Sequence, residues 1–381
     1  MQHDYNQEAL ELHKKYHGKI ETVSKVKLET REDLSRAYTP GVAEVCREIA
    51  KDPSLAREYT LKRNTVAIIS DGSAILGLGN LGPLSAIPVM EGKAAILKSF
   101  AGVDAFPICL DTQDTEEIIK VVKQIAPVFG AVNLEDISAP RCFEIEERLR
   151  KELPIPVMHD DQWGTATVVL AGLMNALKVT DREDNKSIKI VVNGVGSAGV
   201  AISRLLLSSG FTAITFCDSK GIIHEGRDDL TKEKKELITT STATPREGVL
   251  ADAVIGVDVF VGVSKAGALT EEMVKTMNKD AIVFALANPI PEIMPDVAKS
   301  AGVAVIATGR SDFPNQLNNS LIFPGLFKGV LDNNIQQFDI MMFTRAAYAL
   351  ASHVKNPTKD MILPTMFDKD LVDVIATSVI G

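Results

Sequence analysis

The middle of the chain reads SIKIVVNGVGSAG at residues 187–199, and this stretch decides the fold. Its first seven residues form an apolar run typical of a buried strand, and the six that follow fit the pattern G-x-G-x-x-G. An apolar helix over residues 200–209 and a second strand over 212–217 come next, and the strand ends at Asp218. This order of strand, glycine-rich turn, helix, strand and acidic residue predicts a Rossmann-type dinucleotide-binding unit.

The glycine-rich turn and the strand ends beyond it supply the predicted cofactor site. The expected cofactor-binding residues are Gly194, Val195, Gly196, Ser197, Ala198, Gly199, Asp218 and Asn288. The helix N-terminus offers backbone N–H groups to the cofactor phosphates. Asp218 suits the ribose hydroxyls of NAD and would repel the 2′-phosphate of NADP, although Lys220 could soften that repulsion. The predicted cofactor is therefore NAD, with NADP possible, and a turn used only for packing is the alternative.

Strands and helices alternate on both sides of this unit, which is typical of parallel sheets. In the second half, further strands are expected over 257–261, 281–285 and 303–307. In the first half, strands are expected over 65–70, 103–110, 128–134 and 155–158, with helices over 84–100, 115–126, 140–150 and 164–178. The predicted fold class is α/β, with an N-terminal α/β domain for substrate and metal at 1–160 and a Rossmann-type, doubly wound domain at 161–381.

Two acidic clusters follow apolar runs in the first half. Glu135 and Asp136 come after one predicted strand, and Asp160 and Asp161 come after the next. Carboxylates brought together in this way repel one another unless a cation lies among them. Oxygen ligands favour Mg²⁺ or Mn²⁺. The alternative is that these residues only cap helices, with Asp136 capping the helix at 140–150 and Asp160 or Asp161 capping the next.

Two further side chains are candidates for proton transfer. Tyr38 lies on a rigid corner beside proline and glycine, between a turn over 31–37 that a capping box opens and a helix expected over 42–51. Lys93 has apolar neighbours, so desolvation would lower the pKa of its ammonium group toward that of a base. The ordinary alternatives are a surface tyrosine and a lysine that extends to solvent, with Lys98 as the rival base.

Composition limits the classes of partner. The chain has 381 residues, a net charge of −9 and a pI near 5.3, which argues against nucleic acid or an anionic membrane surface. The sequence has no signal-peptide pattern and no apolar run near the ~20 residues needed to span a bilayer. The cysteines are expected to be reduced, buried thiols of a cytoplasmic protein, and they are Cys46, Cys109, Cys142 and Cys217.

Taken together, these stretches resemble the malic enzymes, most closely the short bacterial type without a C-terminal acyltransferase-like extension. The resemblance covers residues 38–329 and rests on separated motifs in the expected order. They are YTPGV at 38–42, SDGSAILGLGNLG at 70–82, MEGK at 90–93, NLED at 133–136, HDDQWGTA at 159–166, GVGSAG at 194–199, ANP at 287–289, and NN with FPG within 318–325. The glycines of residues 71–82 are read as a loop that lets backbone approach a ligand or another element.

The resemblance implies oxidative decarboxylation of L-malate by NAD(P)⁺ to pyruvate and CO₂, with a divalent metal. By resemblance, Lys93 is the base for the C2 hydroxyl and Tyr38 is the acid for C3. The implied metal ligands are Glu135, Asp136 and Asp161, and the implied substrate-binding residues are Tyr38, Lys93, Asn288 and Asn318. Asp160 is left as a neighbour that caps the helix or orients the ligands.

One residue departs from the family pattern. Ala74 stands where other members have an arginine for a malate carboxylate, so that carboxylate must be held by loop N–H groups or another basic side chain. The rival functions are a metal-dependent oxaloacetate decarboxylase or malolactic-type enzyme on the same scaffold and, from another class, a non-catalytic nucleotide-sensing protein. A homodimer is expected, in which a helix over 4–17 packs on the partner and Tyr38 could enter the neighbour's cleft.

Overall fold

The computed structural model describes residues 4–182 and 185–380, and its first sheet has four parallel strands. The strand order is β2-β1-β3-β4, with β1 at Thr65–Ser70, β2 at Asp104–Cys109, β3 at Ala131–Leu134 and β4 at Val157–His159. Helix α5 (Pro83–Ala101) covers one face, and α6 (Thr115–Ile125) and α7 (Arg141–Glu152) cover the other. Because side chains alternate along a strand, Val66 and Ile68 join the first core and Ala67 and Ile69 the second.

The second sheet has six strands in the order β10-β9-β8-β5-β6-β7. The strands are β5 (Ile190–Asn193), β6 (Ile214–Asp218), β7 (Gly221–Ile222), β8 (Val259–Gly262), β9 (Ile282–Ala285) and β10 (Val305–Thr308). All pairs are parallel except β6 with β7, so this is the doubly wound order that the sequence predicted. Its connecting helices are α9 (Ser197–Ser208), α10 (Lys232–Thr240), α11 (Leu250–Ala253), α12 (Glu271–Lys275) and α13 (Pro295–Ser300).

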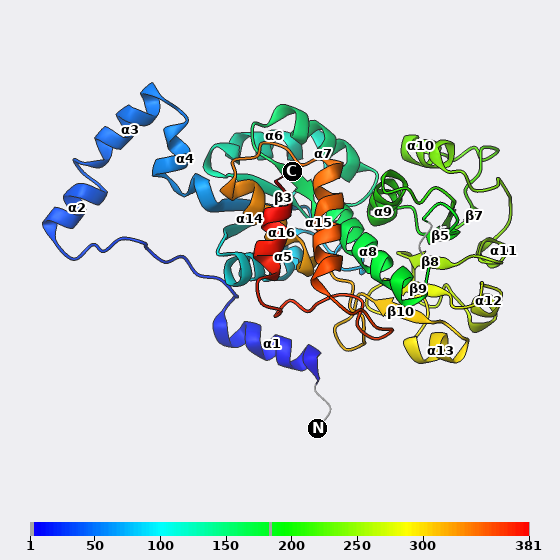
Figure 1. Ribbon diagram of the computed structural model, residues 1–381. Helices are drawn as coiled ribbons and strands as arrows, with labels where there is room; N and C mark the ends of the chain where they lie inside the picture. The colour runs from blue at the N-terminus through cyan, green and yellow to red at the C-terminus, as the bar shows by residue number, and fades with distance from the viewer. Residues whose placement is uncertain (1–3, 183–184, 381) are drawn as a thin grey trace.

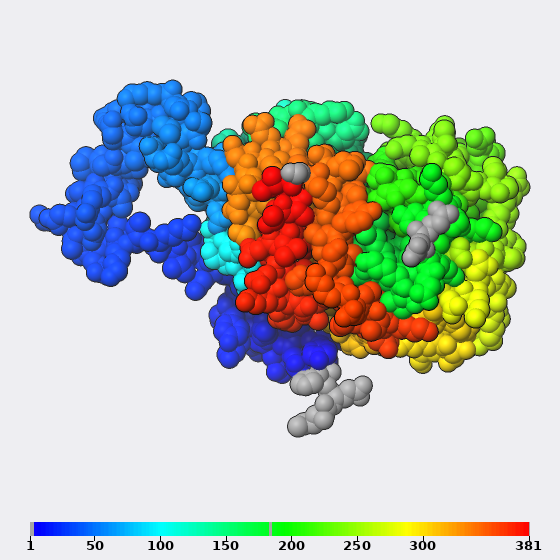
Figure 2. All heavy atoms as spheres, viewed as in Figure 1, coloured from blue at the N-terminus to red at the C-terminus, as the bar shows by residue number. Residues whose placement is uncertain are grey.

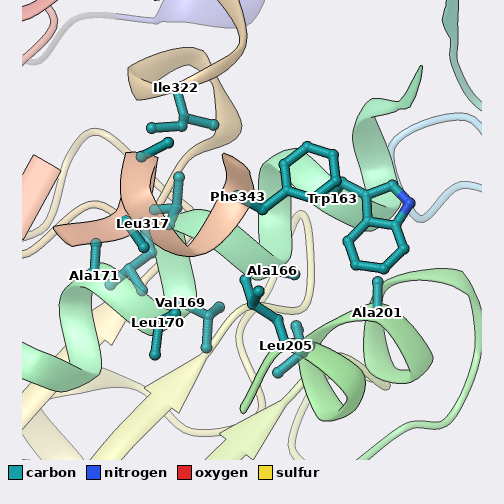
Figure 3. Close-up of a cluster of buried hydrophobic side chains, with 14 of the residues drawn as sticks. Trp163, Ala166, Val169, Leu170, Ala171, Ala201, Leu205, Leu317, Ile322 and Phe343 are labelled. Atoms are coloured by element: carbon teal, nitrogen blue, oxygen red, sulfur yellow. The ribbon is translucent and has the colours of Figure 1, made fainter. Parts of the chain in front are cut away.

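Helix α8 (Asp160–Val179) joins the two sheets and is buried along most of its length. It packs against α9 and against α15 (Ile340–His353), and the Trp163 ring stacks on Phe343 with centroids 4.9 Å apart (Figure 3). Two more C-terminal helices, α14 (Phe323–Asp332) and α16 (Leu371–Ser378), contact each other and α5 of the first sheet (Figure 1). The C-terminal helices therefore fasten the second half of the chain to the first.

The N-terminal segment projects from this body as an arm. It contains α1 (Tyr5–Tyr16), α2 (Arg31–Ala37), α3 (Val42–Lys51) and α4 (Leu55–Tyr59), and none of these helices has a buried residue. Figure 2 shows open space between the stretch that carries α2 and α3 and the rest of the molecule. Near α1, the backbone N–H of Lys19 donates to Glu91 at 3.2 Å, which ties that part of the arm to α5.

Several boundaries differ from the expectation. The run at 126–128 forms a short 3-10 helix, Ala126–Val128, so β3 begins only at Ala131.

Cys142 and Cys217 are buried as expected, but Cys46 is exposed and Cys109 half-buried, so the expectation of four buried thiols was wrong. None of the described helices is long and apolar enough to cross a membrane. The proposed boundary between residues 160 and 161 stays a prediction.

Candidate active site

Three carboxylates meet at the carboxyl ends of β3 and β4. Glu135 and Asp136 directly follow β3, and Asp161 lies in the first turn of α8, which begins where β4 ends. Because β3 and β4 are parallel neighbours, their ends lie at the same edge of the sheet. One oxygen of each residue lies within 4.8 Å of the others. The backbone N–H of Asp136 donates to Asp161 Oδ2 at 2.8 Å, which fixes the segment after β3 to the first turn of α8.

The electrostatics of this cluster fit a cation. Burial, together with the charge of Asp161, raises the pKa of Glu135 well above its ordinary value and that of Asp136 to about 7. Asp136 Oδ2 is also buried without a hydrogen-bond partner among the described residues. An all-oxygen donor set of this kind suits Mg²⁺ or Mn²⁺. The capping alternative was wrong, because α7 and α8 begin after Pro140 and His159 without a side-chain cap.

Lys93 reaches the same cluster from α5. Its Nζ lies 2.8 Å from Glu135 Oε1, also contacts Asp160, and is 4.5 Å from the centroid of the Phe323 ring. Burial lowers the pKa of Lys93, but Asp160, Glu135 and Asp161 together outweigh it, so the pKa is raised. The expectation of a lowered Lys93 pKa was therefore wrong for this arrangement of charges. If those carboxylates were neutralised, the effect of burial would remain and would lower the pKa of Lys93.

The rival base Lys98 and the remaining acidic residue Asp160 have different positions relative to the carboxylate cluster. Lys98, the rival base, is exposed and pairs with Asp104 at 2.7 Å. Asp160 does not cap α8. Its carboxylate instead binds the ammonium group of Lys93. Lys93 is therefore the lysine of α5 that the structure places at the carboxylates.

The glycine-rich loop at 71–82 reaches across to the second sheet. A Cβ atom at Gly77 would lie 2.5 Å from the backbone oxygen of Asn288, so this loop approaches another element as expected. The Ala74 N–H donates to the backbone oxygen of Asp136 at 3.0 Å, so this loop N–H is not free to bind a malate carboxylate. Asn318 caps the short helix Asn319–Leu321 by accepting from Ser320 N–H at 2.9 Å. The loop therefore touches the backbone of Asp136 at Ala74 and approaches the backbone of Asn288 at Gly77.

Tyr38 is the predicted residue that the chain does not bring to this site. It ends α2, which lies in the projecting arm (Figure 1), and the residue is 66% exposed. The structure therefore assembles Lys93 and the carboxylates within one chain but leaves the tyrosine facing solvent.

The glycine-rich turn after β5 opens onto a cavity of about 510 Å³. Asn193, Gly194 and Asp218 are among its lining residues. A Cβ atom at Gly199 would lie 1.8 Å from the backbone oxygen of Gly194, so the close packing of helix on strand requires glycine there. A Cβ atom at Gly196 would meet nothing within 4 Å, so the turn is open where a phosphate would approach.

The sequence did not identify the cations that hold Asp218. Arg227 donates to both carboxylate oxygens, at 2.9 and 2.8 Å, and Lys234 donates to Oδ2 at 2.7 Å. They hold the pKa of Asp218 at about 2, although burial alone would raise it. Lys220, the expected partner, instead pairs its side chain with Asp229 at 2.8 Å. The polar stretch that contains Arg227 and Lys234 carried no periodic signal that could have singled them out.

Glu146 is a second residue that the sequence did not reveal. This buried carboxylate on α7 accepts from the His159 N–H at 3.0 Å, from Gln162 Nε2 at 3.0 Å and from Trp163 Nε1 at 3.2 Å. These three donors flank Asp160 and Asp161 in the chain, so Glu146 fixes the first turn of α8. Burial raises the pKa of Glu146 to about 7.

Replacing Glu146 by glutamine should lower the free energy of unfolding by about 1–3 kcal/mol, because the new amide places N–H groups against buried donors that need an acceptor. Thermal unfolding at about pH 8.5, where the carboxylate is ionised, would show this as a lower Tm. Glu147→Gln is the matched control, since Glu147 is half-exposed and pairs with Lys151 at 2.6 Å. An equal Tm for both variants would contradict the role given to Glu146.

Comparison with known proteins gives consistent matches along the chain. Residues 17–150 match the family model described as malic enzyme, N-terminal domain, and residues 163–380 match malic enzyme, NAD binding domain. A bifunctional malic/malolactic enzyme of Bacillus subtilis is 52% identical over 98% of this chain and 92% of that protein. An NAD-dependent malic enzyme of Geobacillus stearothermophilus is 54% identical over 95% and 76%.

Solved structures agree with these sequence matches. The crystal structure of an NAD-dependent malic enzyme from Thermotoga maritima superposes with a TM-score of 0.94 at 46% identity, covering 98% of this chain and 99% of that one. A malic enzyme structure from Pyrococcus horikoshii gives the same TM-score and identity and covers 98% and 89%. The similarity therefore extends over both sheets and the C-terminal helices.

Proposed function

The chain belongs to the malic enzyme family, and we propose that Lys93, Tyr38 and a divalent cation held by Glu135, Asp136 and Asp161 carry out its reaction. The enzyme is an oxidative decarboxylase that converts L-malate and NAD⁺ or NADP⁺ to pyruvate, CO₂ and reduced cofactor. The observation that supports the proposed site most directly is the contact of Lys93 with carboxylates from two strand ends.

The proposed roles follow from the position of each side chain. With the charges of the carboxylates neutralised, burial would favour the neutral amine of Lys93. This amine would take the proton of the C2 hydroxyl, a bound nicotinamide would supply the hydride acceptor, and Tyr38 would later donate a proton to C3. Asp160 orients the Lys93 ammonium group, with which it forms an ion pair. Asn288 and Asn318 are the proposed amide donors to the substrate. A bound Mg²⁺ or Mn²⁺, held by Glu135, Asp136 and Asp161, would supply positive charge that stabilises negative charge developing on the substrate.

The proposed cation site predicts a response to metal. Mn²⁺ should raise the Tm of the wild-type protein by several degrees at saturation, because a ligand that binds only the folded state stabilises it by about 2.7 kcal/mol at 100 times its Kd. Asp136→Asn should lose this shift and the activity. Without metal, the variant should unfold at the same or a higher temperature, since it relieves repulsion within the cluster.

Differential scanning fluorimetry with and without Mn²⁺ measures this response. The control is Asp296→Asn, which removes the same charge from the exposed side of α13. A Mn²⁺ shift in Asp136→Asn as large as in the wild-type protein would place the cation elsewhere.

The proposed assembly is a homodimer in which the N-terminal arm packs on the partner. A helix held by packing should bury one face, yet none of the four helices of the arm buries a residue in a single chain. The arm exposes large apolar side chains, among them Val23, Val26, Leu28, Leu34, Tyr38 and Val45. A second copy would cover these side chains and receive Tyr38 at its own Lys93. The proposed compartment is the cytoplasm, where thiols such as Cys217 remain reduced.

One assay tests the proposed function. Absorbance of the reduced cofactor would be followed with L-malate and Mn²⁺, in parallel with NAD⁺ and NADP⁺, with pyruvate assayed at the end and a chelator added in a second series. Chelator-sensitive reduction with matching pyruvate is the expected result. Pyruvate formed from oxaloacetate without reduction of cofactor from malate would instead indicate a decarboxylase.

A second activity is suggested by one relative. The Bacillus subtilis protein is described as a malic/malolactic enzyme, so lactate should be measured in the same reactions. Lactate without net reduced cofactor would show that the cofactor returns its hydride to the product before release.

A further inference from the structure

The acceptor atoms of Asp218 are fully used within the protein. A carboxylate offers about four lone-pair positions. Oδ1 accepts from Arg227 Nη1 and from the Lys220 N–H, both at 2.9 Å. Oδ2 accepts from Arg227 Nη2 at 2.8 Å and Lys234 Nζ at 2.7 Å. Asp218 therefore has no free acceptor position for hydrogen bonds from the two ribose hydroxyls of NAD.

The two cations on Asp218 belong to a built site. The exposed fractions of the Arg227, Lys234 and Asp218 side chains are only 10%, 16% and 14%. Arg227 also donates to Asp229 at 2.7 Å, so its guanidinium group is held on two sides. Ion pairs as buried as these are far less screened by salt than surface pairs, so both cations stay close to Asp218.

The nucleotide cavity continues toward Arg227. Asp218, Ser219 and Lys220 line the cavity of about 510 Å³ beside the glycine-rich turn. Lys220 and Val249 also line an adjoining cavity of about 590 Å³, whose wall includes Arg227. Asp228 and Glu247 of that second cavity have exposed side chains, which keeps their charges hydrated. The cavity that Asp218 lines therefore adjoins, at Lys220, the cavity that Arg227 lines.

We propose that Arg227 and Lys234 make the ribose end of the cofactor cavity a binding site for a 2′-phosphate, so that the chain binds NADP⁺ at least as tightly as NAD⁺. The inference rests on the proposed cofactor site at the turn after β5. Asp218 alone would repel the phosphate dianion, but Arg227 and Lys234 contact it directly. Arg227 and Lys220 also pair with Asp229, so three cations face these two carboxylates. Arginine and lysine donors are also the groups that bind phosphate most strongly.

Equilibrium binding tests the proposal without turnover. Calorimetric titrations with NADP⁺ and NAD⁺, and with adenosine 2′,5′-bisphosphate and 5′-AMP as the matching fragments, would be made in the absence of malate and metal. The wild-type protein should bind each 2′-phosphorylated ligand as tightly as its partner or more tightly. Lys234→Met and Arg227→Ala should each weaken binding of the 2′-phosphorylated ligand by about 10- to 100-fold. Neither variant should weaken binding of NAD⁺ or 5′-AMP comparably.

A further variant and a control separate the effect of charge from the effect of hydrogen-bond geometry. Arg227→Lys keeps the charge but loses the two-pronged contact, so it should fall between Arg227→Ala and the wild-type protein. Lys275→Ala is the control, because Lys275 is an exposed cation of the same domain, paired with Glu271 at 2.6 Å. If Arg227→Ala does not fold, Lys234→Met and the wild-type affinities still decide the question.

Two results would overturn the proposal. One is a wild-type protein that binds NAD⁺ more tightly than NADP⁺. The other is an equal loss of both kinds of nucleotide in the variants, which would mean that the cations only hold the loop in shape. Because these titrations do not depend on malate oxidation, a protein that binds the nucleotides but does not oxidise malate would refute the proposed function and leave this inference standing.

Discussion

Replacement of Lys93 by alanine is expected to lower kcat for L-malate oxidation by about 10²–10⁴-fold, the usual contribution of a positioned base. Lys93 is the amine that contacts both Glu135 and Asp160, so its loss removes the proposed base from the carboxylate cluster. The affinity for NAD⁺ should be unchanged, because the cofactor cavity is lined by loops of the second sheet, such as Gly194 and Asp218. Steady-state absorbance and calorimetric titration with NAD⁺ would measure the two quantities.

Two more variants separate a catalytic role from a structural one. Lys98→Ala removes an exposed lysine from the same helix and should leave kcat nearly unchanged. Lys93→Arg keeps a positive charge beside the carboxylates but cannot lose its proton, so it should remain inactive. A normal rate in Lys93→Arg, or a loss of NAD⁺ affinity in Lys93→Ala as large as the loss of rate, would rule out Lys93 as the base.

The fold was predictable where its signals are local. The unit β5-α9-β6 follows from a short apolar run, three glycines and one acidic residue, all close together in the chain. The bounds of α2 and α3 were also predicted, because caps and turn residues mark them. The packing of α14 and α16 on α5 was not predicted, since it joins residues far apart in sequence and leaves no periodic trace.

The site was predictable to the extent that it lies at strand ends. Glu135 and Asp136 could be placed near Asp161 because parallel strands end at one edge of a sheet. The ion pair of Lys93 with Asp160 could not be predicted, because the two residues are 67 positions apart, one within α5 and the other at the start of α8. The sign of the Lys93 pKa shift was therefore wrong when only its neighbours in sequence were considered.

An equal mixture of Lys93→Ala and Tyr38→Phe subunits, unfolded and refolded together, should regain about a quarter of the wild-type activity although each variant alone is nearly inactive. The reason is that Tyr38 is 66% exposed at the end of α2. Figure 1 shows α2 in the arm, away from the body of its own chain. If each site takes Lys93 from one subunit and Tyr38 from the other, a mixed dimer has one site with both native residues. Half of the dimers are then mixed, and half of their sites are intact.

The same mixture gives a different result if the arm folds back onto its own chain. Each site would then lack either Lys93 or Tyr38, so no pairing of subunits could restore activity. A mixture of Lys93→Ala with Lys93→Arg subunits is the control, because neither arrangement can give it an intact site. Activity in the first mixture alone would show that Tyr38 is delivered by the partner. Inactivity of both mixtures, with mixed dimers confirmed by mass spectrometry, would place Tyr38 in the site of its own chain and require the arm to move.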